Sequence, residues 1–317
     1  MTALRRITIL LFIAALSTSC QGKEDGWDTR FVIADAVPVY ERPSPDAKAA
    51  GGLKFGSKIK CSDRGLKNVV TRGWLHVKSG DVRGYIRNSG IADEALYREI
   101  DDLFKAAKEA PVQASGETTR KAALLLKPEN GAFVLQRMRN HVRVEILERI
   151  VVTSGKKGKE KKRLYYKVRL ADGRAGFLRS RQLRLTPPAE LNVYTQVRTP
   201  VSWYVLGEKE DPETKARCSE YLVTYESAAS DIETDFNRME LYTCDPKTRR
   251  YGTALAKSGL HGILPVEITD ASDGGRTIRL RQHPGGNAGK IQTIRYSYPN
   301  PIKLLDEKTE EAPAENH

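Results

Sequence analysis

Short segments in which apolar and polar residues alternate recur along most of the chain. Residues 37–39 and 142–146 place valine or isoleucine at every second position. This period of two predicts β-strands with one buried face. Turn residues that tolerate positive φ, such as residues 79–81 and 171–173, separate several of these segments. The pattern therefore predicts a mainly β chain built from short antiparallel strands.

One sequence unit occurs twice, 92 residues apart. Gly84-Tyr85-Ile86-Arg87 in the first half corresponds to Gly176-Phe177-Leu178-Arg179 in the second. Further segments precede each unit in a similar order, namely 37–43, 51–59 and 73–77 in the first copy and 123–128, 132–135, 142–146 and 165–168 in the second. A glycine before the last aromatic residue suits a strand that bends or approaches a neighbouring backbone. The repeat predicts two copies of one small antiparallel barrel, over residues 31–92 and 121–185.

Together these motifs resemble the bacterial SH3-like domain, a partly open five-stranded barrel found in many envelope and cell-wall proteins. Each copy departs from the family pattern. Its early Asn-Val-Arg segment is replaced by residues 38–42 in the first copy and by residues 125–127 in the second. The second copy also carries a basic insertion, residues 155–163, which we expect to form a loop because its charges repel one another.

The resemblance implies that ligands bind to aromatic residues near the loops of each copy. Aromatic faces stack on sugar rings and cover peptide side chains at a small entropic cost. The implied candidates are Tyr40, Trp74 and Tyr85 in the first copy, and Tyr165, Tyr166 and Phe177 in the second. The alternative for Trp74, Tyr85 and Phe177 is a position facing the core, because each alternates with aliphatic residues.

Residues 93–108 form the one convincing helix expected in the mature chain. Leu96, Ile100, Leu103 and Ala107 recur at helical spacing, Asp93 can cap the start, and Pro111 can stop the end. Because one face is apolar, we expect the helix to pack on a barrel and set the angle between the two copies. Residues 111–119 are polar and predict a linker, so helix and linker together cover residues 93–120.

After Pro187-Pro188 the alternating segments become longer and predict a separate all-β domain over residues 190–305. The clearest strands expected there are residues 221–225, 239–243, 263–268, 277–282 and 291–298. The glycine-rich residues 284–289 lack a following helix, so they predict a hairpin loop rather than a phosphate cradle. The acidic residues 306–317 predict a disordered tail. The fold class expected is two small SH3-like barrels joined by one helix, plus a C-terminal antiparallel β domain.

The N-terminus carries the plan of an export signal. Arg5 and Arg6 precede about ten apolar residues and a cluster of small residues that ends at Cys20. The apolar run is too short to span a bilayer. It resembles the bacterial lipoprotein signal, which implies that residues 1–20 are the signal and that Cys20 is lipidated. The alternative is an ordinary secretory signal, since Ser17 stands where the family has leucine.

Because inner-membrane retention in enteric bacteria usually needs aspartate after the lipidated cysteine, Gln21 implies an outer-membrane anchor facing the periplasm. The formal net charge is +13, and it falls to +11 when Arg5 and Arg6 leave with the signal. Such a charge attracts polyanions. Export excludes nucleic acid as the natural partner and leaves peptidoglycan or other anionic envelope polymers; the alternative is that the charge serves solubility alone.

Four cysteines are present. Whether the last three stay reduced or form a disulfide depends on the redox conditions of the compartment. In an oxidising envelope Cys218 and Cys244, which share the C-terminal domain, predict a disulfide. Cys61 lies in an alternating apolar segment and is interpreted as a small core residue. Five scattered histidines show no ligand spacing, so no metal or cofactor is predicted.

The sequence favours a non-catalytic envelope lipoprotein that binds peptidoglycan or its stem peptides through the SH3-like domains. The second hypothesis is a lipoprotein that recruits another envelope protein through its C-terminal domain. The third is a cysteine peptidase, because Arg217-Cys218-Ser219 resembles the Asp-Cys-Ser-Gly motif of NlpC-type enzymes and His261 and His283 follow. The strand propensity of residues 221–225 and a disulfide at Cys218 argue against that hypothesis.

Overall fold

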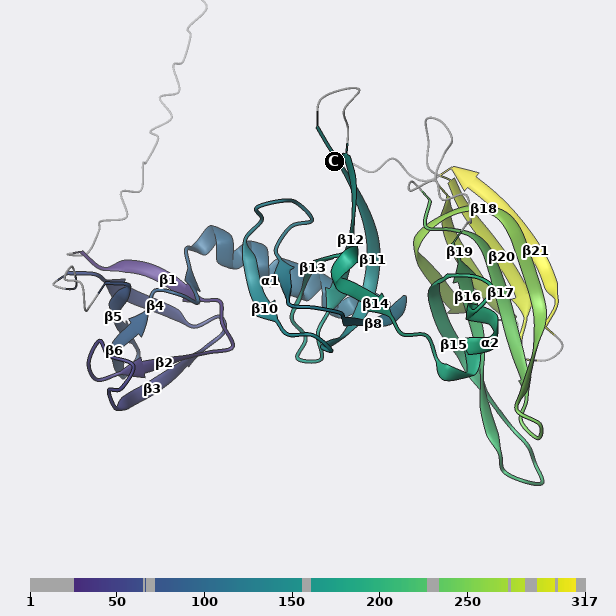
Figure 1. Cartoon of the computed structure of the whole chain (residues 1–317), viewed down its shortest axis with the longest axis horizontal. Helices are drawn as coiled ribbons and strands as arrows, with labels where there is room; N and C mark the ends of the chain where they lie inside the picture. The colour runs from purple at the N-terminus through teal and green to yellow at the C-terminus, as the bar shows by residue number, and fades with distance from the viewer. Residues whose placement is uncertain are drawn as a thin grey trace, which may run out of the picture. The chain divides into compact units, whose positions relative to one another are not determined.

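The computed structural model describes residues 26–64, 66, 72–155, 161–226, 234–272, 275–282, 290–299 and 302–311. The predicted signal with Cys20, the predicted hairpin loop 284–289 and the end of the predicted tail lie outside the described residues, as do residues 156–160 of the basic insertion. The chain divides into two compact units, residues 1–99 and 100–317. The described residues form three antiparallel sheets (Figure 1), which confirms the mainly β fold class.

The first unit holds the first sequence repeat. Its strands are β1 (Asp28–Val32), β2 (Ala36–Tyr40), β3 (Ala49–Lys54), β4 (Lys58–Ser62), β5 (Trp74–Ser79), β6 (Val82–Arg87) and β7 (Ile91–Ala92), in the spatial order β3-β2-β6-β5-β4-β1-β7. Val37, Val39, Val77 and Ile86 from the inner faces of these strands share one core with Cys61. Burial raises the pKa of the Cys61 thiol, and its predicted place in the core is confirmed.

The second unit begins with a sheet of the same design. Its strands are β8 (Ala114–Thr118), β9 (Ala122–Leu125), β10 (Val134–Met138), β11 (Arg143–Ser154), β12 (Lys161–Arg169), β13 (Ala175–Arg179) and β14 (Leu183–Leu185). Their spatial order, β10-β9-β13-β12-β11-β8-β14, matches the first sheet position by position. The internal repeat predicted from the sequence is therefore confirmed in the strand order.

The repeated glycine has a common cause in the two sheets. A Cβ atom on Gly84 would lie 2.5 Å from the backbone oxygen of Tyr40, and one on Gly176 would lie 2.7 Å from that of Leu125. Real Cβ atoms do not approach so closely, so only glycine lets β6 and β13 meet β2 and β9. The expected close backbone approach is confirmed.

Strand β8 corrects the prediction of a linker over residues 111–119. It pairs with β11 on one side and β14 on the other. Thr118 is fully buried, where its hydroxyl donates to the Arg139 carbonyl (2.7 Å) and accepts from the Val142 amide (3.0 Å). Polar and small residues lie inside this strand because their hydrogen-bonding groups find partners in the sheet.

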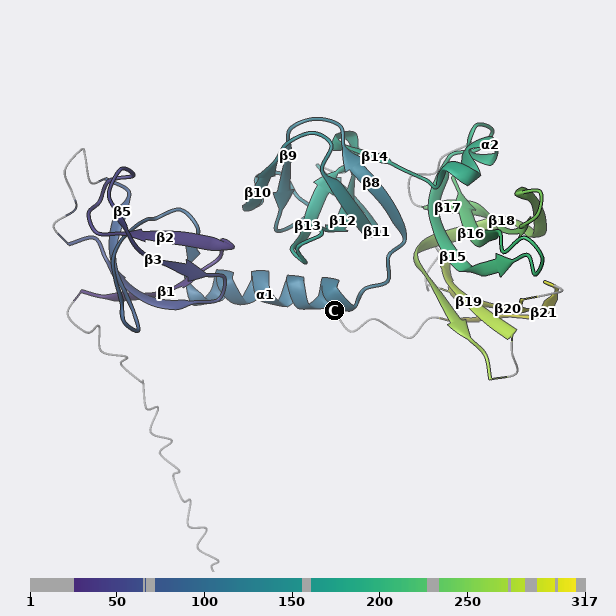
Figure 2. The same ribbon diagram turned by 90° about the horizontal axis from the view of Figure 1, so that it is seen from below.

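Helix α1 (Glu94–Glu109) confirms the predicted helix, and Asp93 caps it by accepting the Leu96 amide at 2.9 Å. In the first unit, Tyr97 stacks on Phe31 with ring centroids 4.6 Å apart. In the second unit, Ala107 packs with Leu147 and Ala175, and Figure 2 shows this end of the helix along the second sheet. No helix in the described part of the chain is both long and apolar enough to span a membrane.

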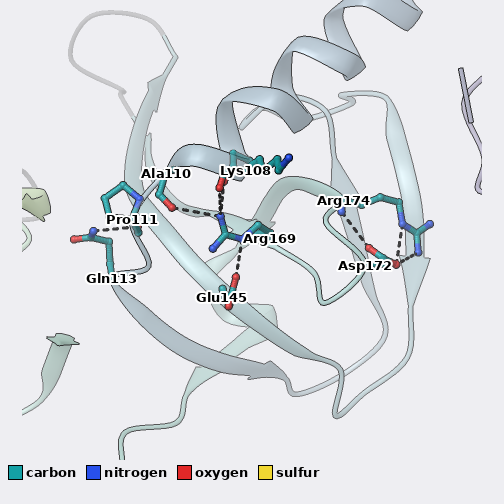
Figure 3. A network of polar contacts seen from close by, with 9 residues as sticks. Lys108, Ala110, Pro111, Gln113, Glu145, Arg169, Asp172 and Arg174 are labelled. Atoms are coloured by element: carbon teal, nitrogen blue, oxygen red, sulfur yellow. Dashed lines mark hydrogen bonds and ion pairs between the residues drawn. The ribbon is translucent and has the colours of Figure 1, made fainter. Parts of the chain in front are cut away.

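Arg169 closes the C-terminal end of α1 (Figure 3). Its Nη1 atom donates to the carbonyl oxygens of Ala107 (2.7 Å) and Lys108 (2.9 Å), and its Nε atom donates to Glu145 (2.6 Å). The last carbonyls of a helix have no partner within the helix and carry partial negative charge. Arg169, which Glu145 holds in place, supplies hydrogen-bond donors to these carbonyls and a positive charge beside their partial negative charge.

Replacing Arg169 with alanine is expected to lower the free energy of unfolding of the second unit by about 1.5 kcal/mol, because the charged hydrogen bonds to the carbonyls of Ala107 and Lys108 are lost. Arg174→Ala is the matched control, since Arg174 pairs with Asp172 two residues away in the same hairpin. That half-buried pair lies within one turn, so its loss is expected to cost about 1 kcal/mol or less. Urea unfolding of both variants measures the difference, and equal losses would refute the capping role.

The C-terminal part of the second unit is a meander of seven strands. They are β15 (Pro200–Glu210), β16 (Arg217–Tyr225), β17 (Phe236–Asp245), β18 (Arg250–Asp270), β19 (Gly275–Gln282), β20 (Lys290–Ser297) and β21 (Leu304–Glu311), paired in chain order. The strands expected from the sequence pattern are confirmed. Three short helices were not predicted, namely η1 (Ser180–Gln182), η2 (Ala189–Leu191) and α2 (Asn192–Thr195).

Strand β21 corrects the prediction of disorder from residue 306 onward. It pairs with β20 over residues 304–311. Within it, Glu307 forms an ion pair with Lys257 and accepts a hydrogen bond from Gln292. These contacts lower the pKa of Glu307. An acidic segment forms an edge strand here because its neighbours supply cations and amide groups.

Gln113 joins the second sheet to the third. It is fully buried. Its backbone nitrogen donates to the Ile146 carbonyl (2.7 Å), and its backbone carbonyl accepts from the Trp203 amide (2.9 Å). Its side-chain oxygen accepts from the Val266 amide (2.7 Å) and from the Tyr204 hydroxyl. A residue expected in a linker is therefore a buried bridge between two sheets.

A buried ion pair forms a second bridge between these sheets. Arg149 of β11 donates to Asp235, with 2.5 Å between Nη1 and Oδ1, and both side chains are about 5% exposed or less. The other Asp235 oxygen accepts the Leu264 amide at 2.7 Å. Burial raises the pKa of Asp235, and the Arg149 guanidinium opposes that rise. The carboxylate depends on the guanidinium to stay charged.

Candidate functional site

A pair formed by an aromatic residue and an arginine occupies the same position in both repeats. Trp74 of β5 lies opposite Arg87 of β6, and Tyr165 of β12 lies opposite Arg179 of β13. Each arginine is three residues after the repeated glycine. Cross-strand neighbours on one face contact each other directly. The repeat therefore places an aromatic ring beside a guanidinium twice.

Each pair lines a cleft of its own repeat. The cleft of the first repeat has a volume of about 340 Å³, and its walls include Pro38, Tyr40, Pro45, Trp74, Arg87 and Ser89. We call it the aromatic cleft. The cleft of the second repeat has a volume of about 710 Å³, and its walls include Arg149, Lys162, Arg163, Tyr165, Arg179 and Arg181. We call it the cationic cleft.

The two clefts are built on equivalent positions beyond the shared pair. Tyr40 lies opposite Tyr85 as Leu125 lies opposite Phe177, so Pro45 and Asn130, each five residues later, correspond. Ser89 and Arg181 each follow the arginine of the pair by two residues. All four of these residues line the cleft of their own repeat. Equivalent positions of the two repeats thus line two clefts whose side chains differ.

The aromatic cleft combines flat apolar surface with one exposed cation. Tyr40 meets Trp74 edge to face, with centroids 5.6 Å apart, and the Arg87 guanidinium lies 4.4 Å from the Trp74 ring centre. Trp74 is only 2% exposed, yet it lies on the face of β5 opposite the core residue Val77. Burial of Trp74 therefore comes from its contacts at the cleft rather than from the main core.

Tyr85 belongs to an aromatic row beside the aromatic cleft. Its ring stacks on His76 with centroids 5.0 Å apart, and His76 lies 5.2 Å from Trp27. Burial and the neighbouring Lys78 lower the pKa of His76, so a neutral imidazole stacks there near pH 7. Tyr40, Trp74 and Tyr85, all predicted as ligand-binding residues, thus lie together on adjacent strands β2, β5 and β6.

In the second repeat the equivalent face is covered. Leu125, Tyr165 and Phe177, which correspond to Tyr40, Trp74 and Tyr85, form one apolar cluster with Leu103 of helix α1. Tyr165 is 1% exposed. Leu103 of α1 packs here, and the positions of Tyr40 and Tyr85, which are half-buried in the first repeat, are buried in the second as Leu125 and Phe177.

Tyr166 lies on the other face of β12 from Tyr165. It pairs with Arg149 across the strands and packs against the cluster shared by the second and third sheets. Burial raises the pKa of Tyr166, and Arg149 opposes the rise. The structure therefore separates the two candidate tyrosines of the second repeat: Tyr165 lines the cationic cleft, and Tyr166 lies beside the buried ion pair.

The cationic cleft concentrates positive charge. Of the described residues that line it, five are basic and one, Glu226, carries a carboxylate. Arg179 donates to the Asn130 side-chain oxygen at 3.0 Å. The Tyr165 hydroxyl is buried and has no hydrogen-bond partner among the described residues. This cleft offers donors in excess of acceptors.

Cys218 and Cys244 form a disulfide between β16 and β17, with their Cα atoms 6.4 Å apart, which confirms the predicted bond. Cys218 therefore has no free thiol to act as a peptidase nucleophile. The residues after it form strand β16, His261 lies in β18, and His283 lies outside the described residues. In the described ranges, no group of three or more His, Cys, Asp and Glu side chains is arranged to hold a metal ion.

The candidates chosen from the sequence did not include the arginines. A signal for Arg87 and Arg179 was present, because each ends the repeated four-residue unit. Asn130 and Arg181 gave no such signal. They reach the cationic cleft from a loop and from η1, so only the fold reveals them.

Comparison with known proteins gives little further guidance. No protein-family model matches the chain, and no curated protein matches it significantly. Similar solved structures include NlpC1 from Trichomonas vaginalis, 11% identical with a TM-score of 0.18, covering 92% of this chain and 93% of that one. NlpC2 from the same organism is 12% identical with a TM-score of 0.18, covering 90% and 96%. Similarity at this level carries no argument about fold or function.

Proposed function

We propose that this protein is a non-catalytic envelope lipoprotein that binds peptidoglycan stem peptides in the aromatic cleft of its first repeat. The observation that carries the proposal is the exposed Arg87 beside the buried Trp74 ring, in a cleft walled by Tyr40 and two prolines. Its volume of about 340 Å³ lies within the range of about 300–1,000 Å³ of small-molecule sites.

The lining fits the chemistry of a stem peptide. Such a peptide carries carboxylates next to small apolar side chains. An arginine binds a carboxylate through two parallel hydrogen bonds. Tyr40 and the prolines Pro38 and Pro45 present rigid apolar surface, which costs little conformational entropy on binding. The contact of Arg87 with Trp74 holds the guanidinium in place before the ligand arrives.

The predicted location of the protein supports the same ligand. The predicted lipid anchor at Cys20 would hold the chain on the outer membrane, facing peptidoglycan. The net charge of +11 after loss of the signal would raise the local concentration of an anionic polymer around the protein. Mass analysis of the mature N-terminus tests the anchor, and a cleavage site away from Cys20 would contradict it.

Arg87→Ala is expected to weaken binding to purified sacculi about tenfold, because the carboxylate loses its charged donor, worth about 1.4 kcal/mol. Arg83→Ala is the matched control. Arg83 is an exposed arginine on the same strand that does not line the aromatic cleft, and its loss removes the same net charge. Co-sedimentation of the soluble chain, residues 21–317, with sacculi measures both variants.

Two results would contradict the proposal. Wild-type protein that stays in the supernatant would exclude peptidoglycan as the ligand. Equal weakening by Arg83→Ala and Arg87→Ala would show attraction by net charge rather than binding in the aromatic cleft. Tyr40→Ala adds an uncharged test, because it removes a cleft wall and leaves the net charge unchanged.

A further inference from the structure

We propose that the cationic cleft of the second repeat is a separate site that binds closely spaced phosphate groups. The proposal is independent of stem-peptide binding, since it concerns a different repeat and a different ligand. It rests on the charge of the cleft, on a buried hydroxyl without a partner, and on the comparison with the aromatic cleft.

Comparison of the repeats shows that the positive charge is particular to this cleft. Ser89 of the first repeat corresponds to Arg181, and Pro45 corresponds to Asn130. Two further cations, Lys162 and Arg163, come from the start of β12. The same surface therefore gains a guanidinium in place of a serine and an amide in place of a proline, and we infer a different ligand for it.

The charge balance of the cleft calls for a ligand with several negative charges. Among the described residues, five basic side chains line the cleft together with one carboxylate, Glu226. Arg149 is also neutralised by Asp235 at 2.5 Å, behind the wall of the cleft. In the described part of the cleft, the basic side chains therefore outnumber the carboxylates beside them. Two neighbouring phosphates, each carrying about −1 to −2, balance such an excess better than one carboxylate does.

Neutral donors complete the lining. The Tyr165 hydroxyl is buried without a partner among the described residues, although Tyr165 lines the cleft. Leaving a buried hydroxyl unpaired is unfavourable, so an acceptor that reached it would gain a hydrogen bond at no cost to another group. Asn130 and Ser180 stand at the same cleft. Phosphate oxygens accept from hydroxyl, amide and guanidinium groups together.

Several donors are held in position before any ligand binds. Asp235 fixes Arg149, and the Asn130 side-chain oxygen accepts from Arg179 at 3.0 Å. Arg163 donates to Ser154 at 3.4 Å on the neighbouring strand. Donors on β11, β12, β13 and η1 thus surround one volume. Such preorganisation reduces the entropy lost on binding.

The test uses the soluble chain, residues 21–317, with inorganic tripolyphosphate as the probe in equilibrium titration at low salt. Wild-type protein is expected to bind saturably. The double variant R163A/R181S, which gives position 181 the residue of the first repeat, is expected to bind at least tenfold more weakly. R139A/R143A is the matched control, because it removes two exposed arginines of the same repeat that do not line the cleft. Far-ultraviolet circular dichroism checks that each variant is folded.

Two further ligands separate the sources of the phosphate. Binding of tripolyphosphate but not of phosphatidylcholine vesicles containing phosphatidylglycerol supports a soluble or wall-polymer phosphate. Binding of both, with the same loss in R163A/R181S, supports a site that also accepts lipid headgroups. Equal affinity for citrate, a tricarboxylate, would overturn the assignment to phosphate. An equal loss in R139A/R143A would overturn the site itself. Sacculus binding through Arg87 should survive in R163A/R181S, so failure of one proposal is distinguishable from failure of the other.

Discussion

Arg149→Met is expected to lower the free energy of unfolding of the second unit by about 3–5 kcal/mol, the usual cost of removing one partner of a buried ion pair. The variant leaves Asp235 enclosed, and among the described residues the Leu264 amide is the remaining hydrogen-bond donor to its carboxylate. Burial already raises the pKa of Asp235, so without the guanidinium the carboxyl must take up a proton or open the structure. Urea unfolding followed by tyrosine and tryptophan fluorescence measures the loss.

The companion double variant shows whether the loss comes from an unpaired charge. Arg149→Met combined with Asp235→Leu removes both charges and is expected to recover most of the stability, because no buried group is left without a partner. An additive loss in the double variant would contradict this explanation. A loss below about 1 kcal/mol in Arg149→Met would show that the pair does not hold the two sheets together.

Removing the disulfide by Cys218→Ala and Cys244→Ala is expected to cost about 3.5 kcal/mol, since the bond closes a loop with a sequence separation of 26. The cost arises mainly because the unfolded chain regains the freedom that the bond removes. The effect should appear as a lower thermal unfolding midpoint of the second unit under non-reducing conditions.

Reduction provides the matched control for this prediction. Dithiothreitol should lower the unfolding midpoint of the wild-type chain toward that of the double variant and leave the variant unchanged. Cys61 is buried in the first unit and is present in both proteins, so it does not contribute to the difference. A wild-type chain that reductant does not destabilise, or whose Cys218 reacts with a thiol label before reduction, would contradict the bond.

Local features of the fold followed from nearby residues. Asp93, the spacing of Ile100 and Ala107, and Pro111 predicted helix α1 because capping and amphipathic periodicity act within a few turns. The repeated glycines predicted a close backbone approach for the same reason, since a missing Cβ is visible at the residue itself. The two polar segments at residues 111–119 and 306–311 were predicted wrongly, because their partners lie in strands far away in the sequence.

The candidate site likewise combines features that nearby residues predict with features that depend on strands distant in the sequence. Sequence patterns alone established a mainly β chain, two repeats and one helix, and they placed two cysteines where a bond could form. Tertiary structure alone decided that Trp74 and Tyr165, both buried, each line a cleft, and that Asn130 and Arg181 belong with Arg179. Periodicity records which face of its own strand a residue occupies. A cleft depends on which strands become neighbours and in which register, and that is set by packing among residues remote in the sequence.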